Sequence, residues 1–348
     1  MFKIKEIISG YRVLNINNKI IYAAKGYKIF QSKDHGKTWV FDGKIHDGKY
    51  SLIANNSRLL ARLLRVEISD LIILDNGTKV VIAKKGIFVA TQNSKIYKKT
   101  LHIPQGKPMN ICLDPTNNNL YIGEYISNGY FDHNEREEVH IYKSEDHGLH
   151  WSICYTFPKN TIRHIHGIYY DKYTENIWIT TGDKGDENII GYTDNDFRTL
   201  EILKKGGQKF RMVRPLFYKD YIVYGTDTHI EQNYIYCINR KTGEVKMLKS
   251  IQGSVISATQ TGDHACIATA IEPSEVNHDE YAYLWFSING LDWENIYRVK
   301  KDSYSAKYFQ FGRILFPHNA ITAEHLYITG HALKGIDNKT LVFSYSLN

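Results

Sequence analysis

The chain has 348 residues, a formal net charge of +7 and 43% hydrophobic residues, with 26 Tyr and only 7 Pro. This hydrophobic content supports a substantial core, and no stretch approaches the ~20 apolar residues of a membrane-spanning helix. The N-terminus lacks the apolar segment and small-residue cleavage site of a secretion signal. The modest positive charge includes no long basic run, which argues against nucleic acid. The sequence therefore predicts a cytoplasmic protein with no nucleic-acid and no membrane partner.

The four cysteines lie in separate apolar, strand-like runs, and no two of them form a CxxC pair. This usage predicts buried free thiols rather than disulfides or a zinc site. The cysteines are Cys112, Cys154, Cys237 and Cys266.

A short hydrophobic strand that ends in small and then polar residues recurs along the whole chain. In chain order the copies span residues 20–25, 80–84, 120–124, 177–183, 221–227, 266–272 and 326–331. Most copies follow another apolar strand and precede a further pair of strands. The repeat therefore predicts antiparallel units of four strands, each about 50 residues long.

Two eight-residue segments share the pattern Ser-x-Asp-x-Gly-x-x-Trp. The first contains Ser32, Asp34, Gly36 and Trp39, and the second contains Ser144, Asp146, Gly148 and Trp151. The residue types suit one tight turn: Asp accepts backbone N–H groups, Gly supplies a positive φ and Trp covers the corner. A degraded third copy at residues 287–293 has Asn289 in place of Asp. The pattern resembles the Asp-box, or BNR, repeat of sialidases and related β-propellers.

Together, the strand repeat and this resemblance predict an all-β fold, a seven-bladed β-propeller of four-stranded antiparallel blades. We expect one domain over residues 1–348, with the N-terminal segment 2–8 pairing with the last blade. A six-bladed ring is the alternative, because residues 66–103 are poorly marked. Residues 51–65 are expected to form a loop or a short helix between the first two blades. The Asp boxes should be structural turns between third and fourth strands.

The resemblance also implies which residues share one face, because the second strands of propeller blades end there and the innermost strands start there. The residues that close the second strands are Lys25, Lys84, Glu124, Asp183, Asp227, Glu272 and His331. The residues that lead into the innermost strands include Arg12, Arg163, His164, His166, Arg211, Arg214, Gln310 and Arg313. Strand ends are polar in any case, so a solvated rim without function is the alternative.

The sharpest local signal is the pair His164 and His166. Residues i and i+2 of a strand point the same way, so both imidazoles should share a face. They could bind a divalent metal, which His229 could complete, or one could act as a base. The other interpretation is that one of them satisfies a backbone carbonyl.

Arginine 211 is the second candidate, since an arginine can bind a carboxylate through two hydrogen bonds. Arg214 lies three residues further on, so only one of the two should reach the site. A salt bridge from Arg211 to Asp183 or Asp227 is the structural alternative.

The whole chain resembles a family of uncharacterised BNR-repeat proteins described as glycosyl hydrolases. The resemblance implies a carbohydrate-active enzyme, a glycoside hydrolase or a polysaccharide lyase, acting on an acidic oligo- or polysaccharide. The proline of the sialidase Arg-Ile-Pro motif is absent at Tyr11–Leu14, which argues against a sialidase. A non-catalytic propeller that binds glycan or protein is the alternative.

The residues at this face are expected to act in catalysis or in substrate binding. The predicted catalytic residues are His164, His166, Arg211, Glu124, Asp183 and Asp227. The predicted substrate-binding residues are Arg12, Arg163, Lys25, Glu272, Gln310 and His331.

Overall fold

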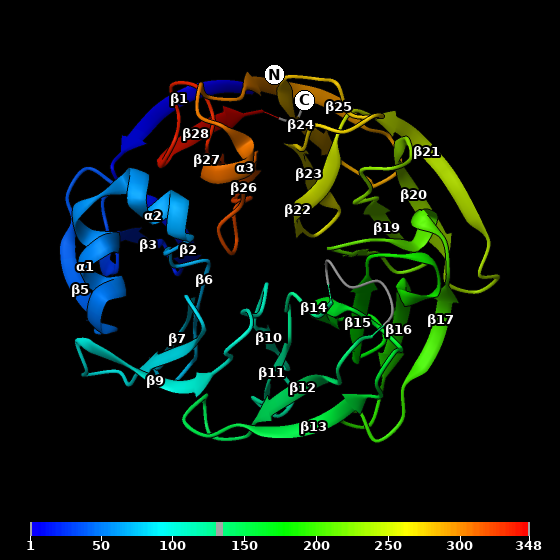
Figure 1. Cartoon of the computed structure of the whole chain (residues 1–348). Coiled ribbons are helices and arrows are strands. Elements are labelled where there is room, and N and C mark those ends of the chain that lie inside the picture. Colours follow the sequence, from blue (N-terminus) through cyan, green and yellow to red (C-terminus); the bar gives the residue numbers. More distant parts are fainter. Residues whose placement is uncertain (1, 130–134, 347–348) are drawn as a thin grey trace. The chain divides into compact units, whose positions relative to one another are not determined.

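The structure is a computed structural model that describes residues 2–129 and 135–346. It is built almost entirely from β-strands, with three short α-helices among the described residues (Figure 1). No helix in this part of the chain has both the length and the apolar character to cross a membrane. The chain divides into two compact units. The first comprises Met1–Ile68, Thr228–Cys237 and Val245–Asn348, and the second comprises Ser69–Asp227 and Ile238–Glu244.

The second unit contains most of the middle of the chain. Its strands are β6 (Asp70–Ile73), β7 (Lys79–Ala83), β8 (Gly86–Ala90), β9 (Ile96–His102), β10 (Cys112–Leu113), β11 (Leu120–Gly123), β12 (Val139–Ser144), β13 (Ser152–Phe157), β14 (His164–Asp171), β15 (Asn176–Gly182), β16 (Ile189–Thr193), β17 (Glu201–Lys205), β18 (Leu216–Phe217) and β19 (Tyr221–Gly225). Two 3₁₀ turns are η1 (Gly185–Glu187) and η2 (Gln208–Phe210). The strands β10–β13 and β14–β17 form two four-stranded antiparallel sheets, and β6–β9 pair in chain order.

The first unit contains both ends of the chain and all three α-helices. Its strands are β1 (Phe2–Ser9), β2 (Arg12–Asn17), β3 (Ile20–Lys25), β4 (Lys28–Ser32), β5 (Val40–Ile45), β22 (Ser254–Thr261), β23 (His264–Ile271), β24 (Tyr281–Ser287), β25 (Glu294–Lys300), β26 (Gly312–Leu315), β27 (His325–His331) and β28 (Lys339–Tyr345). The helices are α1 (Gly48–Asn56), α2 (Arg58–Leu64) and α3 (Ala306–Phe309). Strands β20 (Asn233–Asn239) and β21 (Val245–Ile251) complete a sheet of order β18-β19-β20-β21.

The sequence-based elements agree closely with this arrangement. Each of the repeated hydrophobic strands is found, as β3, β7, β11, β15, β19, β23 and β27. The N-terminal segment pairs with the last strand as predicted, from Phe2 opposite Tyr345 to Ser9 opposite Lys339. The segment 51–65 is helical and contributes to α1 and α2. All four cysteines are free, as expected, but only Cys112 and Cys266 are buried, whereas Cys154 and Cys237 are partly exposed.

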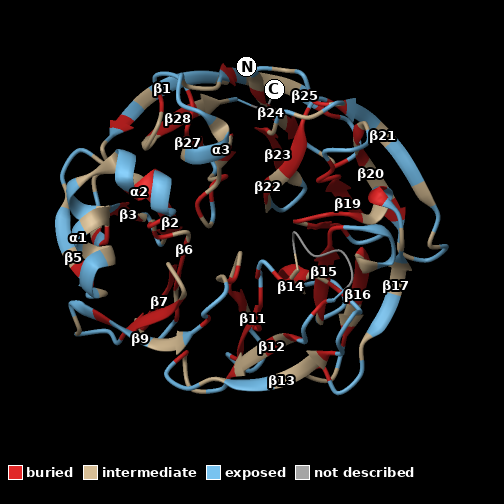
Figure 2. Ribbon diagram, viewed as in Figure 1, coloured by how far each residue is buried: buried red, intermediate tan, exposed pale blue. Residues whose placement is uncertain are grey.

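Burial decreases in chain order across the sheet β14–β17. Strand β14 is buried along almost its whole length, whereas β17 has no buried residue (Figure 2). Strand β15 places Ile177 and Ile179 in the same apolar cluster as Ile165 and Ile168 of β14. Such near-continuous β-branched runs suit strands that are covered on both faces. The functional side chains at the ends of β14 and β15 therefore stand on rigid, well-packed backbone.

The two Ser-x-Asp-x-Gly-x-x-Trp segments form tight turns between third and fourth strands, as predicted. The Gly148 N–H donates to Ser144 Oγ at 2.8 Å, and that hydroxyl donates to Asp146 Oδ1 at 2.9 Å. The Trp151 indole N–H donates to the Gly148 carbonyl at 2.9 Å, and Gly148 has a φ of +86°. Because Ser144 pairs with Leu120 at the start of β11, this turn lies at the opposite end of its sheet from Glu124. Ser144, Asp146, Gly148 and Trp151 thus bond to one another within the turn.

Replacing Ser144 with alanine should lower the free energy of unfolding by about 1–2 kcal/mol. The change leaves the buried Gly148 N–H without its acceptor and removes the donor to Asp146. Chemical denaturation monitored by fluorescence measures the effect. Ser152→Ala, at an exposed position of the neighbouring strand, should change stability by less than about 0.5 kcal/mol. Equal stabilities of the two variants would contradict the structural role of the motif.

Candidate functional site

The hairpin of β14 and β15 carries three convergent polar side chains. His164 opens β14 and pairs with Gly182, the last residue of β15, so Asp183 follows directly beside it. The register shifts between Ile165 and Gly167, which makes His166 the extra residue of a β-bulge. Bulges re-aim side chains, and this one lets His166 reach the same carboxylate as His164.

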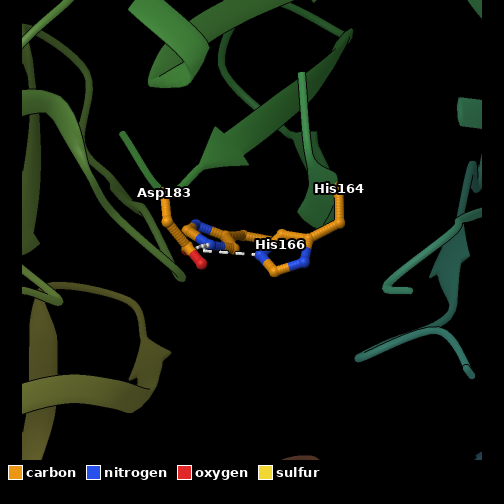
Figure 3. Close-up of side chains that lie close together, drawn as sticks. All are labelled: His164, His166 and Asp183. Carbon is orange, nitrogen blue, oxygen red and sulfur yellow. Dashed lines mark hydrogen bonds and ion pairs between the residues drawn. The ribbon is translucent and has the colours of Figure 1, made fainter. Parts of the chain in front are cut away.

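The three side chains meet at one oxygen atom (Figure 3). The Nε2 atoms of His164 and His166 lie 3.2 and 3.0 Å from Asp183 Oδ1. Both histidines are 1% exposed and Asp183 is 8% exposed. One ligand atom from each residue lies within 4.8 Å of the others, which is a spacing that could hold a metal ion.

The other nitrogen of each histidine contacts a backbone carbonyl. His164 Nδ1 lies 3.0 Å from the Ile126 carbonyl, and His166 Nδ1 lies 2.9 Å from the Met212 carbonyl. A carbonyl can only accept, so each Nδ1 carries a hydrogen and a neutral ring presents a lone pair at Nε2. Two lone pairs and a carboxylate oxygen then face one another. The arrangement accommodates a positive charge between them, either protons on the imidazoles or a metal cation.

Two arginines hold the same carboxylate. Arg163 Nη1 donates to Asp183 Oδ2, and Arg211 Nη2 lies 3.2 Å from Asp183 Oδ1 and 3.5 Å from Asp227 Oδ2. Gln208 Nε2 donates to the Asp183 carbonyl at 2.9 Å. The contact from Arg163 occupies Oδ2, which orients the carboxylate with Oδ1 toward the histidines. Hydrogen-bonded outer contacts of this kind are typical of carboxylate ligands.

The protonation of these groups follows from burial and charge. Burial raises the pKa of Asp183, but hydrogen bonds and positive charge from His164 and His166, present when their Nε2 atoms carry protons, outweigh it and hold this pKa well below its usual range. Burial lowers the pKa of His164, and Asp183 offsets this only in part. Tyr125 packs its ring 4.1 Å from the ring of His164, centroid to centroid. Tyr125 is 37% exposed as a whole, but desolvation of its phenol and the carboxylates of Asp183 and Asp227 raise its pKa, so the phenol stays protonated.

Replacing Gly182 with alanine should displace His166 and disrupt the cluster. A Cβ atom at this position would lie 2.7 Å from His166 Nε2, closer than non-bonded atoms approach. We expect a loss of at least about tenfold in affinity for added Co²⁺, measured by its visible absorption, in line with other disturbed ligand geometries. Gly185→Ala is the control: its φ of +44° gives the alanine some backbone strain, but nothing lies within 4 Å of its Cβ position, so the ligand side chains should keep their places. Unchanged Co²⁺ affinity in Gly182→Ala would contradict the geometry.

The second unit brings together most of the predicted catalytic residues. Five of them form one network of hydrogen bonds and ion pairs: His164, His166, Arg211, Asp183 and Asp227. Arg163, one of the predicted substrate-binding residues, joins this network through Asp183. Glu124 has a different role: its Oε2 accepts the His140 N–H at 2.9 Å and its Oε1 accepts the Tyr142 hydroxyl at 3.0 Å. These bonds tie Glu124 to strand β12.

Only one of the two neighbouring arginines reaches the network, as the sequence predicted. Arg214 instead stacks over the Tyr169 ring, 5.6 Å from its centroid. The candidate metal ligand His229 belongs to the first unit and is exposed. The three-residue cluster found among the described residues contains Asp183 in its place.

The remaining predicted residues belong to the first unit and are Arg12, Lys25, Glu272, Gln310 and His331. His331 Nδ1 lies 3.6 Å from Glu67 Oε2, and Gln310 Nε2 donates to the Arg62 carbonyl at 2.9 Å. Glu272 Oε2 accepts a hydrogen bond from the Ser254 hydroxyl at 3.2 Å. The predicted residues thus fall into two groups, one in each unit. The group around Asp183 is the one that brings possible metal ligands together with arginines.

Three residues that contact the predicted site residues were not predicted from the sequence. Tyr125 follows the selected Glu124 directly, so the strand-end pattern extended by one residue would have found it. Gln208 and Glu67 do not stand at the end of a strand that can be recognised in the sequence. Only their contacts with Asp183 and His331 reveal them.

No protein-family model and no curated protein matches the sequence. Solved structures are similar over the whole chain. YCF48 bound to D1 peptide is 11% identical, with a TM-score of 0.59 over 99% of this chain and 97% of that chain. The WD40 β-propeller domain of Doa1 is 9% identical, with a TM-score of 0.57 over 99% and 97%.

A third similar structure is the extracellular domain of the one-component system BT4673 from B. thetaiotaomicron. It is 13% identical, with a TM-score of 0.58 over 100% of this chain and 40% of that chain. Likeness at such low identity concerns the fold and carries no function. With its antiparallel four-stranded sheets, the chain has a β-propeller fold.

Proposed function

We propose that this protein binds a divalent transition-metal ion through His164 Nε2, His166 Nε2 and Asp183 Oδ1. The observation that carries the proposal is the outer contact of both histidines, whose Nδ1 atoms are bound to backbone carbonyls. The separations of 3.0 and 3.2 Å from Nε2 to Oδ1 suit a shared ion. Two ligand atoms that each lie about 2.1 Å from one metal ion are roughly 3.0–3.4 Å apart when the ligand–metal–ligand angle is between the octahedral and the tetrahedral value. Two imidazoles and one carboxylate favour zinc, iron, cobalt or manganese over calcium.

The substrate class that suits this centre is a glycan bearing carboxylates. Arg163 and Arg211 lie in the network, and a divalent cation would make its net charge positive despite Asp183 and Asp227. A metal ion and guanidinium groups are the partners that a uronate carboxylate prefers. The neighbouring Tyr125, with its raised pKa, is a proton donor at neutral pH.

Between the two reaction classes, we propose a lyase rather than a hydrolase. A glycoside hydrolase needs one protonated carboxyl group as its general acid. Asp183 is held by two arginines and stays ionised, and Glu124 is committed to β12. A lyase needs neutralisation of the substrate carboxylate, a base for the proton on the neighbouring carbon, and a proton for the leaving oxygen. The cationic network would supply the first, the Asp227 carboxylate beside Arg211 would accept the carbon-bound proton, and Tyr125 would protonate the leaving oxygen.

We also propose that the propeller has seven blades. The strands follow one another in groups of four. The groups are β2–β5, β6–β9, β10–β13, β14–β17, β18–β21, β22–β25, and β26–β28 with β1. This grouping supports seven blades over the six-bladed alternative.

A non-catalytic propeller that binds glycan or protein is the second candidate function. The specific observation in its favour is that Arg163 and Arg211 already pair with Asp183, which leaves the charges of the network mutually satisfied. The similar structure of YCF48 is described as bound to a peptide. Propellers support both kinds of function, so the test must separate them.

The test is a screen of acidic polysaccharides with the metal-loaded protein, reading unsaturated uronate absorbance and new reducing ends in parallel. Unsaturated products that depend on metal and vanish in His166→Ala would support the lyase. His102→Ala is the matched control, since His102 Nδ1 also contacts a backbone carbonyl, at 3.1 Å, on an exposed strand. Reducing ends without absorbance would indicate a hydrolase. Glycan binding without either product would favour the binder.

A further inference from the structure

The three helices of the first unit expose an unusual number of large apolar side chains. The ribbons of α2 and α3 are partly pale blue in Figure 2, the colour of exposed residues. Helix α2 presents Leu59, Leu60, Leu63 and Leu64, each at least 40% exposed. Leu52 of α1 is 68% exposed, and Tyr304 and Tyr308 beside or on α3 are 48% and 56% exposed. These seven residues are called the leucine face below. Scattered exposed leucines are common, but several on one seven-residue helix indicate a binding surface.

The leucine face is rigid, because a buried arginine holds α2 and α3 together. The Arg62 side chain is 2% exposed, and its Nε and Nη2 donate to the Phe309 carbonyl at 3.1 and 2.7 Å. Its guanidinium also lies over the Tyr304 ring, 5.3 Å from the centroid. The buried face of α2 is therefore formed by Ala61 and Arg62. The leucines have no place in the core and point to solvent.

The helices that carry the leucine face contain charged residues of positive sign only. Residues 48–66 and 303–309 contain no aspartate or glutamate. Within the part of the chain that the structure describes, the exposed Lys49, Arg65 and Lys307 form no salt bridge. Of the acids beside the helices, Glu67 and Asp337 pair with Arg58 and Asp302 pairs with Arg62, while Asp47, just before α1, is partly buried.

We propose that the leucine face docks on an anionic lipid surface. Leucine and tyrosine flanked by lysine and arginine is the composition of helices that lie in the membrane interface. A second copy of the chain is a poor occupant, since a symmetric contact would bring Lys49, Arg65 and Lys307 of both copies together. The sequence predicted no membrane partner because it lacks a long apolar stretch. A surface contact needs none.

Co-sedimentation with vesicles tests the proposal on the full-length protein. We expect sedimentation with vesicles containing one-third phosphatidylglycerol, little with pure phosphatidylcholine, and a decrease as salt rises. The double variant Leu59→Ser/Leu63→Ser should weaken the partition coefficient at least about tenfold. Lys49→Glu/Arg65→Glu/Lys307→Glu should reduce it to the level seen with neutral vesicles. The matched control Leu149→Ser/Ile153→Ser changes equally exposed apolar residues in the other unit and should bind like the wild type.

Three results would overturn the proposal. One is the absence of sedimentation with anionic vesicles. Another is equal binding by the wild type and Leu59→Ser/Leu63→Ser when circular dichroism shows both to be folded. The third is a wild-type oligomer that this double variant converts to a monomer, which would identify a second copy as the occupant. None of these depends on metal or on glycan cleavage.

Discussion

Replacing Asp183 with asparagine should abolish stoichiometric metal binding and lower the free energy of unfolding of the metal-free protein by about 3–5 kcal/mol. The change removes the negative charge that Arg163 and Arg211 share in a site where Asp183 is 8% exposed. A buried ion pair that loses one partner leaves an uncompensated charge, and this is what costs the stability. Elemental analysis of the purified variant measures the metal, and denaturant titration of the chelated protein measures stability.

Asp171→Asn is the matched control for this prediction. Asp171 is fully buried and accepts a hydrogen bond from Arg240 Nη1 at 2.6 Å, but it lies outside the cluster. It should lose a similar free energy of unfolding and keep the metal. If Asp183→Asn retained one metal ion per chain, the proposed ligand set would be wrong. If it lost metal with no loss of stability, the arginine contacts would carry less energy than their burial implies.

The parts of the fold that follow from local pattern were predictable from the sequence. Strand β3 spans Ile20–Lys25, the same residues as its apolar run, because a short β-branched segment between turn residues has one favourable conformation. The turn at Ser144–Trp151 follows equally from residue types that satisfy one another within eight residues. The same holds for part of the site. His164 and Asp183 stand at the two ends of one hairpin, so strand pairing alone brings them together.

The rest of the site depends on contacts between distant segments, which a single sequence does not encode locally. The carbonyls of Ile126 and Met212 fix the two histidine tautomers, yet a backbone carbonyl leaves no signature in the residue types around it. Arg211 approaches Asp183 from a segment that begins beyond strand β17. The sequence therefore offered a metal or a salt bridge as alternatives. Only the three-dimensional arrangement showed that one carboxylate serves both histidines and both arginines.

The inserted helices show the same limit. The sequence marked residues 51–65 as an insertion without assigning a role to it. Its buried Arg62 is nevertheless the residue that organises α2 and α3, through contacts more than two hundred positions away. An arginine on an otherwise apolar helix would ordinarily be expected in solvent. Its burial is explained by Asp302 and by the Phe309 carbonyl.

Replacing Arg62 with alanine should lower the free energy of unfolding by about 3–5 kcal/mol and release α3 from α2. The substitution leaves the Phe309 carbonyl without its two donors and the Asp302 carboxylate with Lys301 as its remaining charged partner. Denaturant titration measures the stability, and hydrogen exchange of residues 302–310 measures the release. Arg62→Lys should recover only part of the loss, because one ammonium group cannot reach both partners as the planar guanidinium does. Arg65→Ala, exposed on the same helix, should stay within about 0.5 kcal/mol of the wild type.

The pH dependence of the same variant provides a second, independent test. Burial raises the pKa of Asp302, but hydrogen bonds from Arg62 and Lys301 outweigh it and lower this pKa below its usual value. A lowered folded-state pKa contributes stability above the unfolded value of about 3.9, and that stability is lost as pH falls toward the folded value. The wild type should therefore lose stability between about pH 5 and pH 3 more steeply than Arg62→Ala. Parallel pH profiles of the two proteins would show that Arg62 does not stabilise the Asp302 carboxylate.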